Sequence, residues 1–541
     1  MNRRRVATGA AASVAGAAAL VGGISVVARL VGFGRQVVFQ STVGPYVLGD
    51  VYTTANSLPN VVFEIVAGGA LASIVVPVLA SAAARGDAEQ VKRTTSALLS
   101  WTLLLLIPVA LLGVLVAGPV MSLMLEGNGG TDAVVVGRRL FIIFLPQIPL
   151  YGVAVVTAGV LQAHRRFFAA ATAPVVSSLV VAGAYVTFAA VFRGDRDDVT
   201  TLDPLSEAIL AGGTTLGVLA LALVTLLPML LRVTGVRPTL HFPPGIASRV
   251  RALAAAGLVT LMSQQLAMVV AWRSANAELG DGAMVTYTNS WMVYLLPYAV
   301  LAVPIATAAF PRLTEHAGER GSPPTTEYTS VLARTTRAVL LVCLLGTAVI
   351  IATSWPVARF FGLIGQSGNE EIDPTWMGWA LVAFAPGLLG YGLVALLGRA
   401  LYARGRGRAA ATATVSGWLT AAVAAMVLSA LAPGRLVVGS LGLAHTLGMI
   451  VAGVLLIAAV HRDGGPAATS GLVRVFLVGA LAAALGGFAG KLTATLVPQT
   501  SASWVLLAGF AAAAVTVVVT GVIAWLATPA DTRSVLLRRN R

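Results

Sequence analysis

Arginines inside apolar segments are the residues of this chain with the most distinctive chemistry. Arg29 and Arg35 frame the segment Ala28-Arg29-Leu30-Val31-Gly32-Phe33-Gly34-Arg35, and Arg273 lies in a later apolar segment. A charge within a membrane-length segment is costly, so it usually faces a bundle interior or a wet cavity and marks a functional site. Guanidinium groups in such a place favour an anionic, phosphate-bearing cargo.

The spacing of these arginines ranks them as candidates. Arg29 and Arg35 are six residues apart, which places them about 120° apart around an ideal helix. They share a face only loosely, unless Gly32 and Gly34 let the helix bend or unwind. Arg29, in the middle of its segment, is the stronger cavity candidate. Arg35 and Arg273 lie nearer to span ends, where a long side chain can instead extend to the lipid headgroups.

A second group of polar residues follows the arginines. Asp50 precedes an apolar segment, where an acidic residue would stabilise a helix N-terminus. Asn60 follows Pro59 and is expected to satisfy backbone groups that the proline frees. Glu64 is a buried-carboxylate candidate, with three readings left open: an ion pair with an arginine, a proton carrier, or a side chain at a wet kink.

The composition requires a membrane-embedded scaffold for these residues. The chain has 541 residues, of which 57% are hydrophobic and only 11% are charged. Runs of about 20 apolar residues recur from end to end, as in transmembrane helices. We therefore predict an all-α polytopic membrane protein with about 14 transmembrane helices. The predicted spans lie near 13–41, 50–80, 96–121, 136–161, 168–192, 207–231, 252–276, 284–310, 331–361, 376–403, 409–431, 436–460, 473–497 and 503–527.

The net charge of +15 fits membrane topology better than nucleic-acid binding. Basic residues occupy every second loop, and acidic or neutral residues occupy the others. Lys and Arg in short loops mark the cytoplasmic side, so both termini are predicted to be cytoplasmic. Arg138 and Arg139, at an outer helix end, are the main exception.

An internal repeat divides the chain. At an offset of about 240 residues, Phe144 matches Phe384 and Tyr151-Gly152 matches Tyr391-Gly392. Six spans separate the copies, so both insert with the same orientation, which is typical of two-lobed transporters. The predicted parts are an N-terminal six-helix lobe (1–235), a parallel C-terminal six-helix lobe (245–465), two extra helices (470–530) and a basic cytoplasmic tail (531–541).

Catalytic motifs are missing from the sequence. It contains no phosphate-binding Gly-x-x-x-x-Gly-Lys-Ser/Thr loop, no His-Glu-x-x-His and no Gly-x-Ser-x-Gly. Five histidines are scattered, and the single cysteine, Cys343, forms no disulfide framework. These features favour a secondary transporter over an enzyme, with no metal site and no cofactor; a coupling ion, if used, is unidentified.

The arginine motif, Asp50 and Leu58-Pro59-Asn60 resemble the MviN/MurJ family of lipid II flippases, within the multidrug/oligosaccharidyl-lipid/polysaccharide exporter superfamily. The resemblance covers most of the chain, including the last two spans, which are similar to a helix pair that holds the lipid tail. It implies a bacterial plasma-membrane protein that exports lipid-linked peptidoglycan precursor by alternating access, for cell-wall organisation and cell shape. The implied partners are an undecaprenyl-pyrophosphate type of lipid, membrane lipids and the cell-wall machinery, with no nucleic acid.

The chain departs from this family at two cavity arginines. Phe63 and Met292 stand where the resemblance predicts cations, so Arg29 and Arg35 carry over, and Arg273 is a possible substitute for one lost charge. Two alternatives therefore remain: an exporter of another lipid-linked glycan or small molecule, or a non-transporting paralogue that acts as a cell-wall scaffold.

Overall fold

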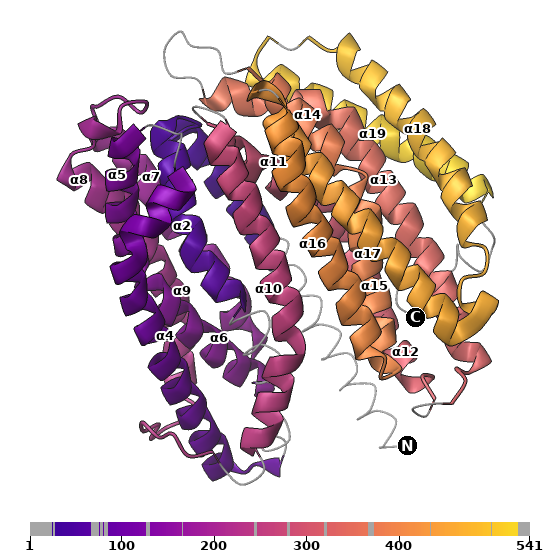
Figure 1. Ribbon diagram of the computed structural model, residues 1–541, viewed down its shortest axis with the longest axis horizontal. Coiled ribbons are helices and arrows are strands. Elements are labelled where there is room, and N and C mark those ends of the chain that lie inside the picture. The colour runs from indigo at the N-terminus through magenta and orange to yellow at the C-terminus, as the bar shows by residue number, and fades with distance from the viewer. Residues whose placement is uncertain are drawn as a thin grey trace, which may run out of the picture. The chain divides into compact units, whose positions relative to one another are not determined.

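The computed structural model of the chain describes residues 24, 27–65, 75, 79, 85–125, 130–164, 166–242, 246–278, 282–318, 322–365, 373–432, 434–498 and 500–527. Within these ranges the secondary structure is helical, with no strand. By contacts, the chain forms two compact units, Met1–Met262 and Ser263–Arg541. The prediction of an all-α fold is confirmed (Figure 1).

The first unit contains a helical segment at 27–42 followed by longer helices. These are α2 (Val47–Phe63), α4 (Ala88–Leu125), α5 (Gly130–Phe144), α6 (Gln147–Ala163), α7 (Phe167–Val191), the short α8 (Pro204–Glu207) and α9 (Gly213–Leu230). Helix α10 (Ile246–Glu278) runs across the boundary between the units.

The second unit continues with α11 to α19. Their bounds are α11 (Ala283–Pro297), α12 (Val303–Glu315), α13 (Thr326–Gly365), α14 (Thr375–Phe384), α15 (Gly387–Ala403), α16 (Gly407–Leu431), α17 (Val437–Ala468), α18 (Leu472–Leu496) and α19 (Ala502–Ala527). Short π-helical turns, Ala208–Gly212 and Tyr298–Ala302, precede α9 and α12.

Helices are the expected form because a spanning segment must satisfy its own backbone hydrogen bonds in lipid. Ten described helices or helix pairs are long and apolar enough to cross a membrane, and the bent pair α14–α15 (42°) makes an eleventh. They correspond to eleven of the 14 predicted spans. The predicted spans near 13–41 and 50–80 fall partly outside the described residues, as do the side chains of the first part of α10, so the count of 14 is not established.

In the first unit, the loop at 193–203 fixes the start of α2. The backbone N–H of Leu48 donates to the carbonyl of Arg196 (3.0 Å), and the N–H of Val47 donates to the Asp197 carboxylate (3.4 Å). These bonds satisfy donors that a helix N-terminus leaves open. They hold α2 in place, and α2 carries much of the candidate site.

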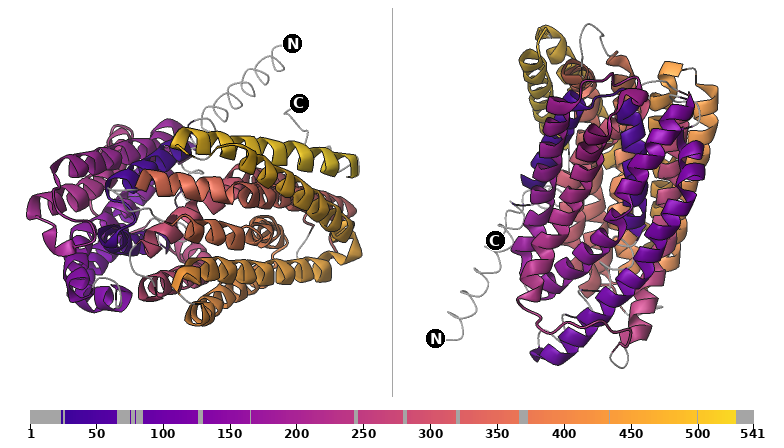
Figure 2. Two further views of the ribbon diagram at one scale, coloured as in Figure 1. Left: turned by 90° about the horizontal axis from the view of Figure 1, so that it is seen from above. Right: turned by 90° about the vertical axis from the view of Figure 1, so that its left-hand side faces the viewer.

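In the second unit, small residues allow close helix packing. Helices α16 and α17 lie side by side, and α18 packs on α19 and α13, as Figures 1 and 2 show. Gly486 and Gly490, four residues apart on α18, face Thr520 and Thr516 of α19 so closely that an added Cβ would collide with either hydroxyl. This is the small-residue spacing by which membrane helices approach one another.

Candidate functional site

Arg35 is the predicted cation that the structure places nearest to a polar cluster. It lies in the helical segment 27–42, half-buried, and its Nε atom is buried without a hydrogen-bond partner among the described residues. The same segment contacts the cluster through Phe39, whose ring centroid lies 5.4 Å from that of Tyr52 on α2 and 5.2 Å from that of Tyr185 on α7. A buried donor left unsatisfied is costly, so this guanidinium is suited to receive an acceptor from a ligand.

The tyrosine cluster is held together by short hydrogen bonds. The Tyr52 hydroxyl lies 2.9 Å from that of Tyr185 and 2.7 Å from Oγ1 of Thr214 on α9. Thr214 also donates to the carbonyl of Leu210 (2.8 Å). Phe144 contacts the Tyr52 ring edge-on at 5.4 Å between ring centroids. Side chains of α2, α7 and α9 therefore hold these hydroxyl groups in place, and Phe144 of α5 packs against them.

Asn60 connects this cluster to α6. Its side-chain oxygen accepts a hydrogen bond from the Tyr151 hydroxyl (2.9 Å), and its Nδ2 donates to the carbonyl of Asn56 (2.9 Å). The carbonyl that Pro59 leaves without its N–H donor is that of Ala55, one residue earlier. Asn60 thus bridges α2 and α6. Its side chain bonds the carbonyl of Asn56, and not that of Ala55 as expected from the sequence. Phe63 stacks on Tyr151 with 4.3 Å between ring centroids.

The other predicted residues of the first unit lie around this cluster. Arg29 and Glu64 are exposed, and Asp50 is fully buried. The helix is continuous through Gly32 and Gly34, whose surroundings are open, so the backbone does not unwind between the arginines. Asp50 is the fourth residue of α2, in its first turn but not at the N-cap, which is Tyr46. A carboxylate in the first turn is still favoured by the helix dipole.

The second unit contains an aromatic cluster that sequence reasoning missed. His445 of α17 is buried, and its Nε2 lies 3.0 Å from the Tyr294 hydroxyl. Five aromatic rings surround the imidazole, with centroids 4.8 to 5.9 Å away: Trp291, Tyr294, Phe384, Tyr391 and Trp418. The sequence could have indicated this cluster, because His445 stands alone in an apolar span and a buried histidine requires a hydrogen-bond partner.

Two ring contacts in the second unit resemble the Tyr151–Phe63 and Phe144–Tyr52 contacts of the first unit. Tyr391, the repeat counterpart of Tyr151, contacts Tyr298 at 4.3 Å between centroids, and Phe384, the counterpart of Phe144, contacts Tyr287 at 5.8 Å. Arg273, the predicted cation of α10, is half-buried in this unit.

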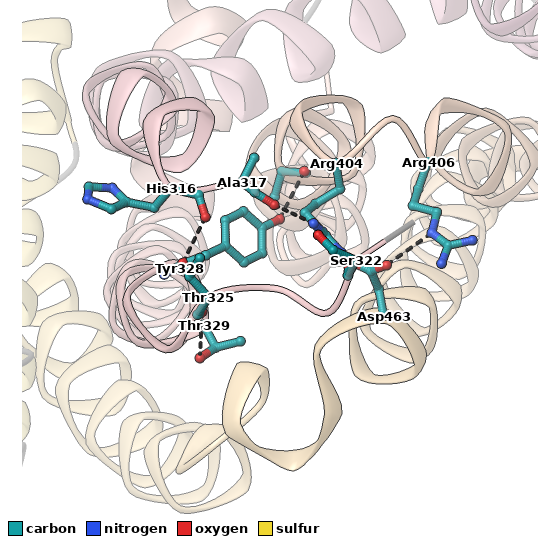
Figure 3. A network of polar contacts seen from close by, with 10 residues as sticks. His316, Ala317, Ser322, Thr325, Tyr328, Thr329, Arg404, Arg406 and Asp463 are labelled. Atoms are coloured by element: carbon teal, nitrogen blue, oxygen red, sulfur yellow. Dashed lines mark hydrogen bonds and ion pairs between the residues drawn. The ribbon is translucent and has the colours of Figure 1, made fainter. Parts of the chain in front are cut away.

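A polar network closes one end of the second unit (Figure 3). The buried Arg404 donates through Nε to Asp463 (2.9 Å), and through its other nitrogens to the carbonyls of Ala317 and Ser322. Arg406 reaches the second oxygen of Asp463 at 3.0 Å. The network joins the ends of α15 and α17 to the loop before α13. It is a structural tie, since every guanidinium nitrogen of Arg404 has an acceptor.

The first unit thus contains a half-buried arginine, whose Nε lacks a partner among the described residues, together with hydrogen-bonded hydroxyl groups, and such groups can bind an oxyanion. Among the same residues, no three His, Cys, Asp or Glu side chains lie together as a metal site would require. The fold defines the class: a polytopic α-helical membrane protein with ten or eleven candidate spans among the described residues.

Comparison with known proteins gives the family. The chain belongs to the family described as "Lipid II flippase MurJ", whose model matches residues 39–525. The match begins four residues after Arg35, so the arginine motif lies just before it. The family is one of membrane transporters, in agreement with the expectation of a transporter and not an enzyme.

Individual relatives are distant. A probable lipid II flippase MurJ of Rhizobium meliloti (strain 1021) is 27% identical over 356 residues, 65% of this chain and 64% of that protein. The match therefore spans slightly less than two thirds of that relative. A lipid II flippase MurJ of Burkholderia cenocepacia is 25% identical over 394 residues, 71% of this chain and 72% of the relative.

Solved structures agree on the fold. A lipid II flippase MurJ in an inward closed conformation superposes with a TM-score of 0.71 at 17% identity, covering 93% of this chain and 98% of that one. An inward-facing multidrug resistance transporter of the MATE family gives a TM-score of 0.63 at 16% identity, covering 82% and 96%. Both likenesses show the same fold.

Proposed function

We propose that this chain carries lipid II, the lipid-linked peptidoglycan precursor, from the inner to the outer leaflet of the bacterial plasma membrane. Family membership across residues 39–525 supports the activity. The structural observation that carries it is Arg35, whose buried Nε has no acceptor among the described residues, in a helical segment that contacts the rings of Tyr52 and Tyr185 through Phe39.

In this proposal the pyrophosphate of the cargo supplies the missing acceptor. A guanidinium donates to phosphate oxygens with charge-assisted bonds, which are about twice as strong as neutral ones. Asn60 and Thr214 hold the hydroxyl groups of Tyr151 and Tyr52, so these groups lose little freedom when a ligand binds. Arg29, six residues before Arg35, is proposed to contact the headgroup as it enters or leaves.

Several finer features belong to the same proposal. Transport by alternating access of two six-helix lobes, 1–235 and 245–465, follows from the internal repeat. We infer cytoplasmic termini from the alternation of basic loops. Helices α18 and α19 are proposed to guide the lipid tail, and Arg273 to assist with the headgroup. No cofactor is required, and association with the cell-wall synthesis machinery would follow from this role.

Depletion of the protein in its own cells tests this proposal. The amount of lipid II in each leaflet is measured, and the cells are complemented with wild type, Arg29→Ala or Arg35→Ala. We expect accumulation in the inner leaflet, reversed by wild type and by a control, Arg193→Ala in an exposed loop. An unchanged distribution after depletion, or full rescue by both cavity variants at normal expression, would contradict the proposal and favour another cargo or a scaffold role.

A further inference from the structure

One end of the first unit holds a basic pocket that continues into an apolar groove. The pocket has a volume of about 450 Å³, and the groove about 530 Å³. Both are formed by α4 and the non-helical segment at 233–242, and both include Ser96 and Arg237. They therefore make up one continuous surface with a charged part and an apolar part, which we call the α4 site.

The α4 site is preformed, because hydrogen bonds tie the segment at 233–242 to the helix. The backbone N–H of Arg237 donates to Ser96 Oγ (3.2 Å), and that of Thr239 donates to Ser100 Oγ (3.0 Å). Trp101 Nε1 donates to the carbonyl of Leu240 (3.0 Å). The side chains of Ser96, Ser100 and Trp101 thus fix the position of the segment along α4.

The charged part attracts anions. Lys92, Arg93 and Arg237 line it with a single carboxylate, Glu89, and with His241. Glu89 pairs with Lys92 (2.7 Å) and with Arg93 (2.9 Å), whereas Arg237 has no ion pair with a described residue. The pocket therefore keeps a net positive charge of two with histidine neutral, centred on Arg237 and the amine of Lys92.

The apolar part fits a hydrocarbon chain. Its wall consists of Leu99, Leu103, Leu104, Ile107, Val236 and Leu240. Leu104 and Ile107 are about half exposed, on a helix whose hydropathy is that of a membrane span. A ligand for the whole site must therefore combine a phosphate-type headgroup with an apolar tail.

We propose that the α4 site binds one anionic phospholipid of the surrounding bilayer. Its phosphate is held by Lys92 and Arg237, and an acyl chain lies along Leu103, Leu104 and Ile107. Charge complementarity and the continuity of pocket and groove specify this occupant, because basic pockets at the membrane surface select anionic headgroups. Binding adds to the three hydrogen bonds that already tie the segment at 233–242 to α4. The proposal is independent of the transported cargo.

Lipid titrations of the purified full-length protein in detergent micelles test this directly. Dioleoylphosphatidylglycerol and dioleoylphosphatidylcholine are added separately, and bound lipid is counted by native mass spectrometry alongside the thermal unfolding midpoint. The test variant is Lys92→Gln with Arg237→Gln. The matched control, Arg462→Gln with Arg474→Gln, removes the same charge from two exposed arginines elsewhere.

We expect wild type and control to bind one phosphatidylglycerol more tightly than phosphatidylcholine. The test variant should bind it about 25-fold more weakly, at about 5-fold per cation removed. Arg237→Lys should retain binding, and Leu104→Gln should weaken it. Both variants must keep the wild-type midpoint without added lipid. Equal affinity for the two lipids, an equal loss in the control, or equal stabilisation by inorganic phosphate alone would overturn the proposal.

Discussion

The rings of Phe63 and Tyr151 stack with their centroids 4.3 Å apart, at the position of α2 where the family resemblance predicts an arginine. An aromatic pair therefore occupies the place of a cation. Arg35 lies in the helical segment 27–42, which contacts the neighbouring tyrosines Tyr52 and Tyr185 through Phe39. The proposed headgroup site of the first unit consequently relies on Arg35.

Restoring the cation at position 63 should strengthen binding of the pyrophosphate. We predict that Phe63→Arg raises the affinity for lipid II by about 1.5–3 kcal/mol, the value of a hydrogen bond to a charged group. Phe63→Leu, which removes the stack without adding a charge, serves as the control. Affinity is measured on purified protein with labelled lipid II. Equal affinities for the two variants would show that the position does not face the headgroup.

The tyrosine cluster should contribute to stability as well as to the site. Tyr52→Phe removes one hydroxyl that bonds both Tyr185 and Thr214. Leaving a buried polar group without its partner costs about 1–3 kcal/mol, so the unfolding free energy in a detergent titration should fall by that amount. Tyr402→Phe, on a half-exposed ring, should change it little. Equal effects would mean that the buried hydrogen bonds add nothing.

Asp463, near the end of α17, pairs with Arg404 and Arg406, and the two pairs should contribute differently to stability. Asp463→Ala leaves the buried Arg404 without its carboxylate, and loss of one partner of a buried pair costs about 3–5 kcal/mol. Arg406 is 60% exposed, so Arg406→Gln should cost only about 0–1 kcal/mol. Both are measured by unfolding of the purified protein. A similar cost for the two substitutions would argue against the tie seen in Figure 3.

The contact between α18 and α19 depends on glycine at position 490. Gly490→Val would place a side chain against Thr516 and should destabilise the protein by about 1–3 kcal/mol through overpacking. Gly521→Val, on α19 where nothing lies close to the added Cβ, is the matched control. Thermal unfolding of both variants checks the prediction, which fails if Gly521→Val is the more damaging change.

Much of the scaffold could be predicted because hydropathy dictates it. Eleven predicted spans correspond to described helices, since an apolar run of membrane length has no other stable form. Arg139, an exception to the alternation of basic and acidic loops, has a partner that is distant in the sequence. Its guanidinium pairs with the mostly buried Glu207 at 2.8 Å, so this arginine is neutralised locally.

The site was less predictable, because its partners come from distant helices. The sequence identifies Arg29 and Arg35, but which of them approaches Tyr52, Tyr151 and Tyr185 depends on how α2, α6 and α7 rotate about their axes. Hydropathy does not encode that rotation. The rings around His445 come from four helices for the same reason.

The central claim is that Arg35 holds the anionic headgroup of a lipid-linked cargo. Translocation of labelled lipid II by purified protein in liposomes tests it most directly, with wild type, Arg35→Ala and the loop control Arg193→Ala compared at equal incorporation. Loss of one charge-assisted contact of about 1.5–3 kcal/mol predicts a rate at least about tenfold lower for Arg35→Ala and unchanged for Arg193→Ala. Equal rates for all three proteins would contradict the account.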